Sequence, residues 1–162
     1  MATTVTFRAT ATSAREAHAA GELAAWAQWF NREGGGDGMI ADALLREDYV
    51  YLMAELPLAD IYPVGGPSPS FDHPDVPDEL ERKVVEMIGL FERGWDAPPV
   101  FVHLPSYRMV DGGHRRQALL RLGQKNYWAV CWMTRPPLTG RGQYWAPRDD
   151  NPATRRVPPS PD

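Results

Sequence analysis

The chain has 162 residues, of which 43% are hydrophobic and 23% are charged, and its formal net charge is −4 at pH 7. This length and composition fit one soluble globular domain with a substantial core, and the acidic balance argues against the broad basic surface of a general nucleic-acid binder. The single cysteine, Cys131, excludes an internal disulfide, and no apolar run approaches the roughly 18 residues of a membrane span. We therefore expect a cytoplasmic protein without a membrane segment.

The N-terminal region, residues 1–48, is predicted to be a helical extension. Ser13, followed three residues later by a glutamate, forms a capping-box pattern that predicts a helix to about Glu33. Apolar residues at helical spacing predict its buried face: Leu23, Trp26, Ala27 and Phe30. Three consecutive glycines end this helix, and Asp37 is placed to start a shorter one that reaches about Asp48.

The middle of the chain begins with an extended pattern at Glu55–Pro63, in which Pro57 suggests an edge position in a sheet. A loop at 64–77 follows, and a loop of this length in a compact domain is more often functional than merely connective. A helix is then predicted from residue 77 to residue 93, where Gly94 stops it. Its core face is predicted to consist of Leu80, Val84, Val85, Ile88 and Phe91.

Strands and a further helix are predicted beyond this point. A strand pattern covers Pro98–Leu104, and a turn leads from it into a second strand at Tyr107–Val110. A helix follows at Gly113–Leu122 with Gly123 as its C-terminal cap, and the last strand covers Asn126–Met133. The inward-facing residues of that helix are predicted to be Ala118, Leu119 and Leu122.

The final residues, 134–162, differ in character because they contain seven prolines and five arginines. This composition predicts an irregular tail. The whole pattern predicts an α+β fold in which helices pack against a small sheet, with a helical N-terminal extension and an irregular Pro-rich C-terminal tail. Five tryptophans are expected mainly in the core, although one of them could stack on a nucleobase: Trp26, Trp29, Trp95, Trp128 and Trp132.

The most specific pattern is the segment Arg108–Gly123, which reads as a short strand, a tight turn and the start of a helix. A helix N-terminus offers unpaired backbone N–H groups and the positive end of the helix dipole. Two glycines let the backbone approach a ligand closely, and the side chains that follow add charged or polar donors, so the segment favours an anion such as a phosphate. The candidate site residues are Asp111, Gly112, Gly113, His114, Arg115 and Arg116.

Each charged or polar candidate has two roles that the sequence leaves open. Arg115 either contacts the phosphate or pairs with a carboxylate on the helix surface, and His114 either donates to a phosphate oxygen or caps the helix. Arg116 points about 100° around the helix from Arg115, so it either joins the site or lies in solvent. Asp111 either holds Mg²⁺ or a substrate hydroxyl, or it is the N-cap of the helix.

The turn motif Val110-Asp-Gly-Gly-His-Arg115 is accompanied by three weaker signatures, Gly94-Trp95, Pro98-Pro99-Val100 and Leu122-Gly123. Together they resemble the ParB/sulfiredoxin-like superfamily, whose pattern they match over residues 54–133. The Asp-Gly-x-His-Arg form is most similar to the free serine kinase branch. Members of the superfamily bind nucleotides at this turn, so the resemblance implies a nucleotide-binding domain at 49–133, between the N-terminal extension and the tail.

This chain departs from the superfamily pattern at several positions, and these departures reduce the number of activities that the resemblance implies. A sulfiredoxin carries its catalytic cysteine immediately before the His-Arg pair, where this chain has Gly113. The ParB partition proteins carry a Gly-Glu-Arg-Arg turn and added DNA-binding and dimerisation regions, for which we expect no room here. The free serine kinases need a glutamate in the loop after the first strand. The nearest carboxylates in this chain are Glu55, Asp60, Asp72 and Asp75.

The resemblance implies an ATP- or ADP-dependent phosphotransferase that acts with Mg²⁺ on a small hydroxylated metabolite. In this hypothesis Asp111 and His114 act in catalysis, while the segment Gly112–Arg116 holds the nucleotide. Two alternatives remain open: a non-catalytic module that responds to nucleotide binding, and a DNA-directed, nuclease-type ParB-like protein. The N-terminal extension is expected either to cover the nucleotide site or to form a homodimer interface.

Overall fold

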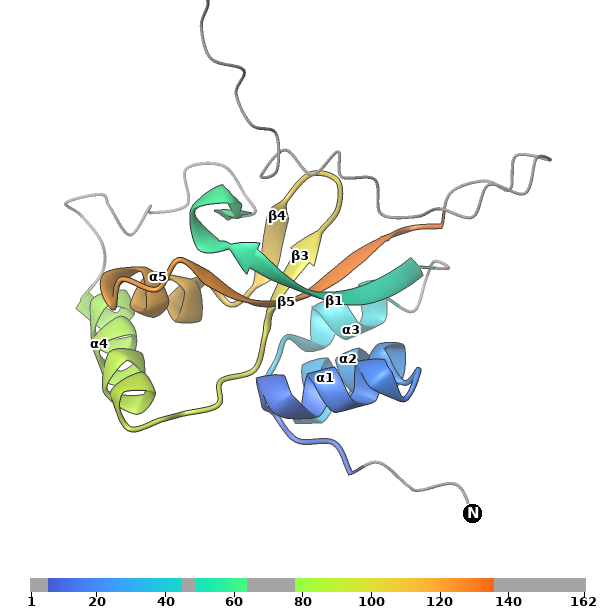
Figure 1. Cartoon of the computed structure of the whole chain (residues 1–162), viewed down its shortest axis with the longest axis horizontal. Helices are drawn as coiled ribbons and strands as arrows, with labels where there is room; N and C mark the ends of the chain where they lie inside the picture. The colour runs from blue at the N-terminus through green and yellow to red at the C-terminus, as the bar shows by residue number, and fades with distance from the viewer. Residues whose placement is uncertain (1–5, 45–48, 64–77, 136–162) are drawn as a thin grey trace, which may run out of the picture.

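The computed structural model describes residues 6–44, 49–63 and 78–135. Its element order and its five-stranded mixed sheet confirm the predicted α+β fold (Figure 1). The predicted loop at 64–77, with Asp72 and Asp75, and the tail from residue 136 onward lie outside the described residues. No helix in the described ranges is both long and apolar enough to cross a membrane.

The sheet has the strand order β1-β5-β3-β4-β2 and combines parallel with antiparallel pairs. Its strands are β1 (Tyr49–Pro57), β2 (Tyr62–Pro63), β3 (Val100–His103), β4 (Arg108–Asp111) and β5 (Asn126–Thr134). The long strands β1 and β5 pair antiparallel over their whole length, whereas β3 runs parallel to β5 and forms a hairpin with β4. Because β1 lies at one edge, the edge position expected of Pro57 is confirmed.

The described helices are α1 (Ala11–Ala19), α2 (Leu23–Glu33), α3 (Gly38–Leu44), the 3₁₀ turn η1 (Leu58–Asp60), α4 (Asp78–Glu92) and α5 (Gly113–Arg121). The single helix predicted from Ser13 to Glu33 is wrong, because Gly21 takes a φ of +75° and separates two helices there. The first helix is capped by Thr10, whose Oγ1 accepts the backbone N–H of Ser13 at 3.0 Å. Asp37 precedes α3, and its carboxylate accepts a backbone N–H of that helix, as predicted.

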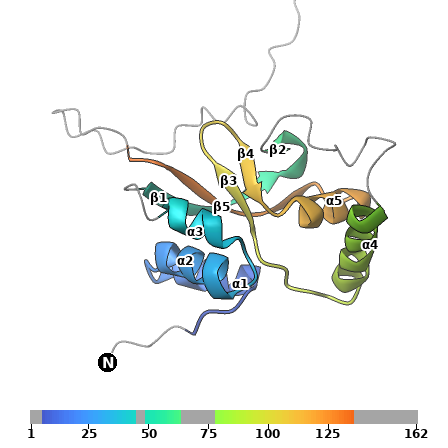
Figure 2. The ribbon, with the colours of Figure 1, turned by 180° about the vertical axis from the view of Figure 1, so that it is seen from behind.

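The helices α1, α2 and α3 cover one face of the sheet (Figures 1 and 2). Trp26 and Phe30 of α2 stack on Phe101 of β3, with ring centroids 6.2 and 5.6 Å from the Phe101 ring. The buried face that was predicted for this region is confirmed. A backbone hydrogen bond of 3.0 Å from Ala11 to the carbonyl of Ala97 also joins α1 to the segment before β3. The N-terminal helices and the sheet therefore share a core.

The helix α5 packs on the other face of the sheet, and α4 packs mainly against α5. Leu119 of α5 is buried there with residues of β3 and β5. The predicted core faces of these two helices are only partly right. Val84 of α4 is fully buried, but Val85 is 55% exposed, and Leu122 after α5 is 39% exposed. The reason is that α4 lies beside a helix instead of on the sheet, so less of its apolar surface is covered.

Candidate functional site

The turn between β4 and α5 has the predicted strand–turn–helix geometry. β4 ends at Asp111, Gly112 has a φ of +109°, and α5 begins at Gly113. A side chain at position 112 would be strained by this φ, and its Cβ would lie 2.6 Å from Cγ1 of Val100. The carbonyl of Gly112 accepts the N–H of Arg116 at 2.9 Å, which begins the hydrogen-bond ladder of the helix. Glycine is therefore needed here for both conformation and space.

Within the part of the chain that the structure describes, the N-cap of α5 is Gly112, and it provides no side-chain hydrogen bond to the first turn of the helix. The N-cap role left open for Asp111 is wrong, because Gly112 occupies the N-cap position and the carboxylate of Asp111 is turned toward Arg115. The first turn of α5 therefore offers its backbone N–H groups and the positive end of the helix dipole at an N-cap that has no side chain of its own.

Arg115 is turned into the interior of the protein. Its side chain is only 10% exposed, and its Nη2 donates to the carbonyl oxygen of Pro99 and to Oδ2 of Asp111, each at 3.3 Å. The guanidinium carbon lies 5.9 Å from the ring centroid of Phe30. Of the two roles left open for Arg115, the ion pair is the one observed, although the pair is largely buried instead of lying on the helix surface. The guanidinium holds the turn against the segment before β3.

His114 and Arg116 have different surroundings from Arg115. Partial burial lowers the pKa of His114 below its usual value, and the positive charges of Lys83 and Arg115 lower it further. Nε of Arg116 donates to the carbonyl oxygen of Leu58 at 2.9 Å, which connects α5 to η1. The prediction that the two arginines diverge around the helix is confirmed, since one bonds in the interior and the other bonds at η1.

The described part of the site offers three kinds of group. They are the backbone N–H groups of the first turn of α5, the imidazole of His114, which is mainly neutral at pH 7, and the carboxylate of Asp111, which is held by Arg115. The side chain of Asp111 is 25% exposed, so it borders the surface of the turn. Among the described residues, no group of three or more His, Cys, Asp or Glu side chains could hold a metal ion. A divalent ion at this turn would depend mainly on oxygen ligands from the bound molecule, with Asp111 beside them. The arrangement suits an anion held by backbone groups.

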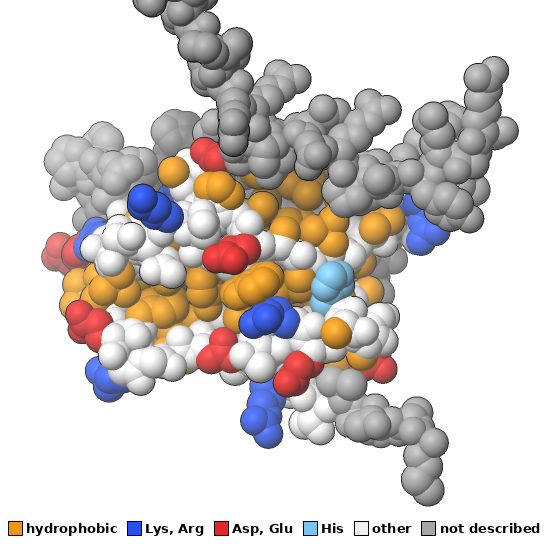
Figure 3. Space-filling model, viewed as in Figure 1, with side chains coloured by type: hydrophobic (Ala, Val, Ile, Leu, Met, Phe, Trp, Pro, Cys, Tyr) orange, Lys and Arg blue, Asp and Glu red, His pale blue; other side chains and the backbone are white. Residues whose placement is uncertain are grey.

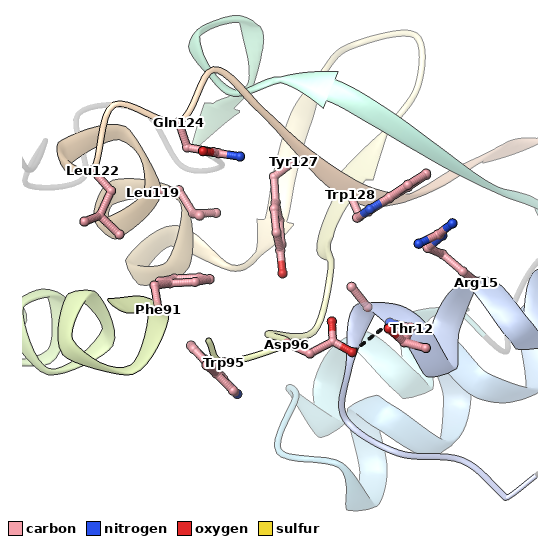
Figure 4. Close-up of a pocket in the computed structure, with 11 residues that line it drawn as sticks. Thr12, Arg15, Phe91, Trp95, Asp96, Leu119, Leu122, Gln124, Tyr127 and Trp128 are labelled. Carbon is pink, nitrogen blue, oxygen red and sulfur yellow. Dashed lines mark hydrogen bonds between the residues drawn. The ribbon is translucent and has the colours of Figure 1, made fainter. Parts of the chain in front are cut away.

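A groove of about 370 Å³ lies between α1, the end of α4, α5 and the start of β5 (Figure 4). We define the aromatic groove by four aromatic and two charged residues of its lining: Phe91, Trp95, Tyr127, Trp128, Arg15 and Asp96. The prediction that Trp95 and Trp128 belong mainly to the core is wrong, because both are half-buried and line this groove. No signal in the sequence marked the groove, because its lining comes from segments that lie far apart along the chain.

Comparison with known proteins adds little to this geometry. No family model and no curated protein matches the chain. A solved structure of a Pnob8-like ParB-N domain is similar to it, with a TM-score of 0.37 and 14% sequence identity over 54% of this chain. The matched part is 32% of the length of that ParB-N chain, so this protein spans about a third of it. A similarity at this level assigns neither a family nor an activity.

Proposed function

We propose that this protein binds a nucleotide, ATP or ADP, through its phosphates at the N-terminus of α5. The observation that carries the proposal is that this nine-residue helix begins directly after the positive-φ Gly112, an N-cap residue with no side chain to bond the N–H groups of the first turn. Such a terminus combines backbone donors with the positive end of the dipole, which is a general anion-binding arrangement. The resemblance of the motif Asp111-Gly-Gly-His-Arg115 to a nucleotide-binding turn supports a nucleotide as the anion.

The candidate residues have distinct roles in this proposal. The backbone N–H groups of residues 113–115 contact the phosphate oxygens, and the half-buried ring of His114 adds a polar group in the same turn of α5. Arg115 is a positioning residue, because it holds Asp111 and the turn from the interior. Lys83 of α4 acts on the pKa of His114 and adds positive charge on that side of the turn.

Phosphoryl transfer to a small hydroxylated metabolite is the catalytic form of the proposal. The lowered pKa of His114 leaves its ring mainly neutral at pH 7, so it can accept the proton of an acceptor hydroxyl. The hydroxyl oxygen forms a bond to the terminal phosphorus as the bond from that phosphorus to the bridging oxygen breaks, and the shortened nucleotide leaves. Mg²⁺ bound to the phosphates would offset their charge, with the carboxylate of Asp111 as a neighbouring ligand.

A nucleotide-responsive module without catalysis is the second candidate, and the ion pair between Asp111 and Arg115 favours it. The pair commits the carboxylate to holding the turn, which leaves it poorly placed to orient an acceptor hydroxyl. In this form, nucleotide binding stabilises the turn and changes the surface around it, and no phosphoryl group is transferred.

Calorimetric titration of the 162-residue chain with ADP and ATP, with and without Mg²⁺, tests binding. Gly113→Asp places a carboxylate in the first turn of α5, where it suits the helix dipole but repels a phosphate, whereas Gly113→Ser stays neutral. Two unit charges about 4 Å apart in water repel by about 1 kcal/mol, so Kd should rise at least about fivefold in Gly113→Asp relative to Gly113→Ser. Ala24→Asp, in the exposed first turn of α2, is the matched control and should bind like the wild type. Equal affinities of the two Gly113 variants would contradict a phosphate at this helix end.

Turnover separates the two forms of the proposal. The protein is incubated with Mg-ATP or Mg-ADP and a set of small hydroxylated metabolites, and the shortened nucleotide is measured. The catalytic form predicts steady nucleotide consumption that depends on the acceptor and is lost in His114→Gln. Binding without consumption assigns the protein to the module form.

A further inference from the structure

The aromatic groove has a fixed apolar wall on the side of α4 and β5. The rings of Phe91 and Trp95 lie 5.1 Å apart between centroids, and Tyr127 meets Phe91 nearly at right angles at 6.2 Å. The hydroxyl of Tyr127 donates to the carbonyl of Ala97 at 2.7 Å, which fixes the orientation of its ring. Hydrophobic side chains gather on this part of the surface, over α5 and between α4 and β5 (Figure 3).

The opposite wall of the groove carries charge. The guanidinium carbon of Arg15 lies 4.4 Å from the ring centroid of Trp128, so this wall already holds a cation against an aromatic face. Oδ2 of Asp96 accepts the backbone N–H of Thr12 at 3.2 Å, which fixes the exposed carboxylate at the mouth of the groove (Figure 4). The groove thus combines aromatic rings that are held in place with an oriented carboxylate.

One segment of the chain has the chemistry that fits such a groove. Residues 155–161 read Arg-Arg-Val-Pro-Pro-Ser-Pro. A polyproline II helix has about three residues per turn, so in that conformation Arg155, Pro158 and Pro161 share one edge. Proline-rich segments with this spacing bind grooves lined by aromatic side chains, because their prolines favour the bound conformation and little entropy is lost.

We propose that residues 155–161 dock in the aromatic groove of the same chain, with Pro158 and Pro161 against the rings and Arg155 beside Asp96. The charges are complementary, since the segment has two arginines and no acidic residue in a protein of net charge −4. The docking does not depend on nucleotide binding.

The length of the chain permits this docking. Trp128 lies six residues before the end of β5 at Thr134, which corresponds to about 20 Å along a strand. The chain between Thr134 and Arg155 can span up to about 65 Å in a polyproline II conformation. The segment can therefore reach the groove within one molecule.

A spin label placed on the segment tests the proposal in the whole chain. Cys131 is fully buried and burial raises its pKa to about 12, so the thiol of Ser160→Cys is the one that reacts with a nitroxide reagent. The indole N–H signals of Trp95 and Trp128 should be lost in the NMR spectrum of the labelled protein and return when the label is reduced. The signal of Trp26, which is fully buried between α2 and the sheet, should persist. If the Trp95 and Trp128 signals are as strong as that of Trp26, the proposal is overturned.

Matched proline variants in the labelled protein show whether the signal loss depends on the prolines proposed to contact the groove or only on the tail being near it. Pro158→Ala with Pro161→Ala removes the groove-facing prolines, and the Trp95 and Trp128 signals should recover. Pro136→Ala with Pro137→Ala removes as many prolines elsewhere in the tail and should leave the signals lost. Neither pair alters a residue in the described ranges, so a failure of the first pair to restore the signals would contradict docking by the 155–161 segment.

A charge exchange tests the contact proposed between Arg155 and the carboxylate of Asp96. Arg155→Glu should restore the Trp95 signal at least in part, and Asp96→Lys added to Arg155→Glu should weaken it again. A signal loss that grows with protein concentration would show that the segment of another molecule occupies the groove, which contradicts docking within one chain.

Discussion

Replacing Gly112 by alanine should destabilise the fold through two separate effects. Gly112 has a φ of +109°, and an L-residue forced into the left-handed region costs roughly 1–2 kcal/mol. The new Cβ would also lie 2.6 Å from Cγ1 of Val100, which is fully buried, and overpacking of this kind costs about 1–3 kcal/mol. The free energy of unfolding should therefore fall by about 2–5 kcal/mol, a large share of the stability of an ordinary domain. Equilibrium unfolding in urea, followed by tryptophan fluorescence, measures the change.

Gly123→Ala is the matched control for this experiment. Gly123 follows the same helix and has a φ of +76°, but no atom lies within 4 Å of the position that its Cβ would take. This variant should show the conformational effect alone. Val100→Ala in the Gly112→Ala background should cost less than Val100→Ala does in the wild type, because it also removes the clash. If Gly112→Ala costs no more than Gly123→Ala, the reasoning about the contact with Val100 is refuted.

Three further predictions concern buried groups. Arg115→Met should lower the free energy of unfolding by about 3 kcal/mol in urea, because it leaves the Asp111 carboxylate without its cation, and Asp111→Leu in the same chain should recover part of the loss. Cys131 should stay unreactive toward an aromatic disulfide reagent at pH 8 until urea unfolds the protein, since burial raises its pKa to about 12. Because the pKa of His114 in the folded state is lowered, the unfolded state binds more protons below about pH 6.5, and stability is lost as the pH falls. The urea midpoint should therefore drop less between pH 7 and pH 5 in His114→Gln than in the wild type, and equal drops would exclude His114 as a source of the pH dependence.

The sequence predicted the elements whose apolar residues form a clear pattern or an unbroken run. The apolar spacing of α2 and the run of β5 both correspond to buried residues in the structure. The first six residues of β1, from Tyr49 to Ala54, were not recognised as a strand, and all six are half-buried. Because burial is not confined to one face of this strand, its sequence does not alternate between apolar and polar residues. The two-residue period that predicts a strand is therefore missing. Gly21 was missed for a different reason, because the apolar pattern continues on both sides of the break.

The backbone of the site was predictable, and the direction of its side chains was not. Two adjacent glycines between a strand and a helix signal a tight turn from local sequence alone. The inward position of Arg115 depends on the carbonyl of Pro99 and the ring of Phe30, which lie far from it along the chain. The aromatic groove is likewise assembled from α1, the end of α4 and the start of β5, and no local pattern joins these segments.

The most direct test of the nucleotide proposal is the backbone amide spectrum of the protein during titration with ADP. Phosphate oxygens at the N-terminus of α5 would bond to the N–H groups there, so the largest shifts should occur at Gly113, His114 and Arg115. Ala24 and Ala25, in the first turn of α2, serve as internal controls and should stay in place. Saturable shifts centred on the first turn of α5 are the predicted result. No shift at Gly113–Arg115, or shifts confined to another surface, would contradict the assignment of this turn as the phosphate site.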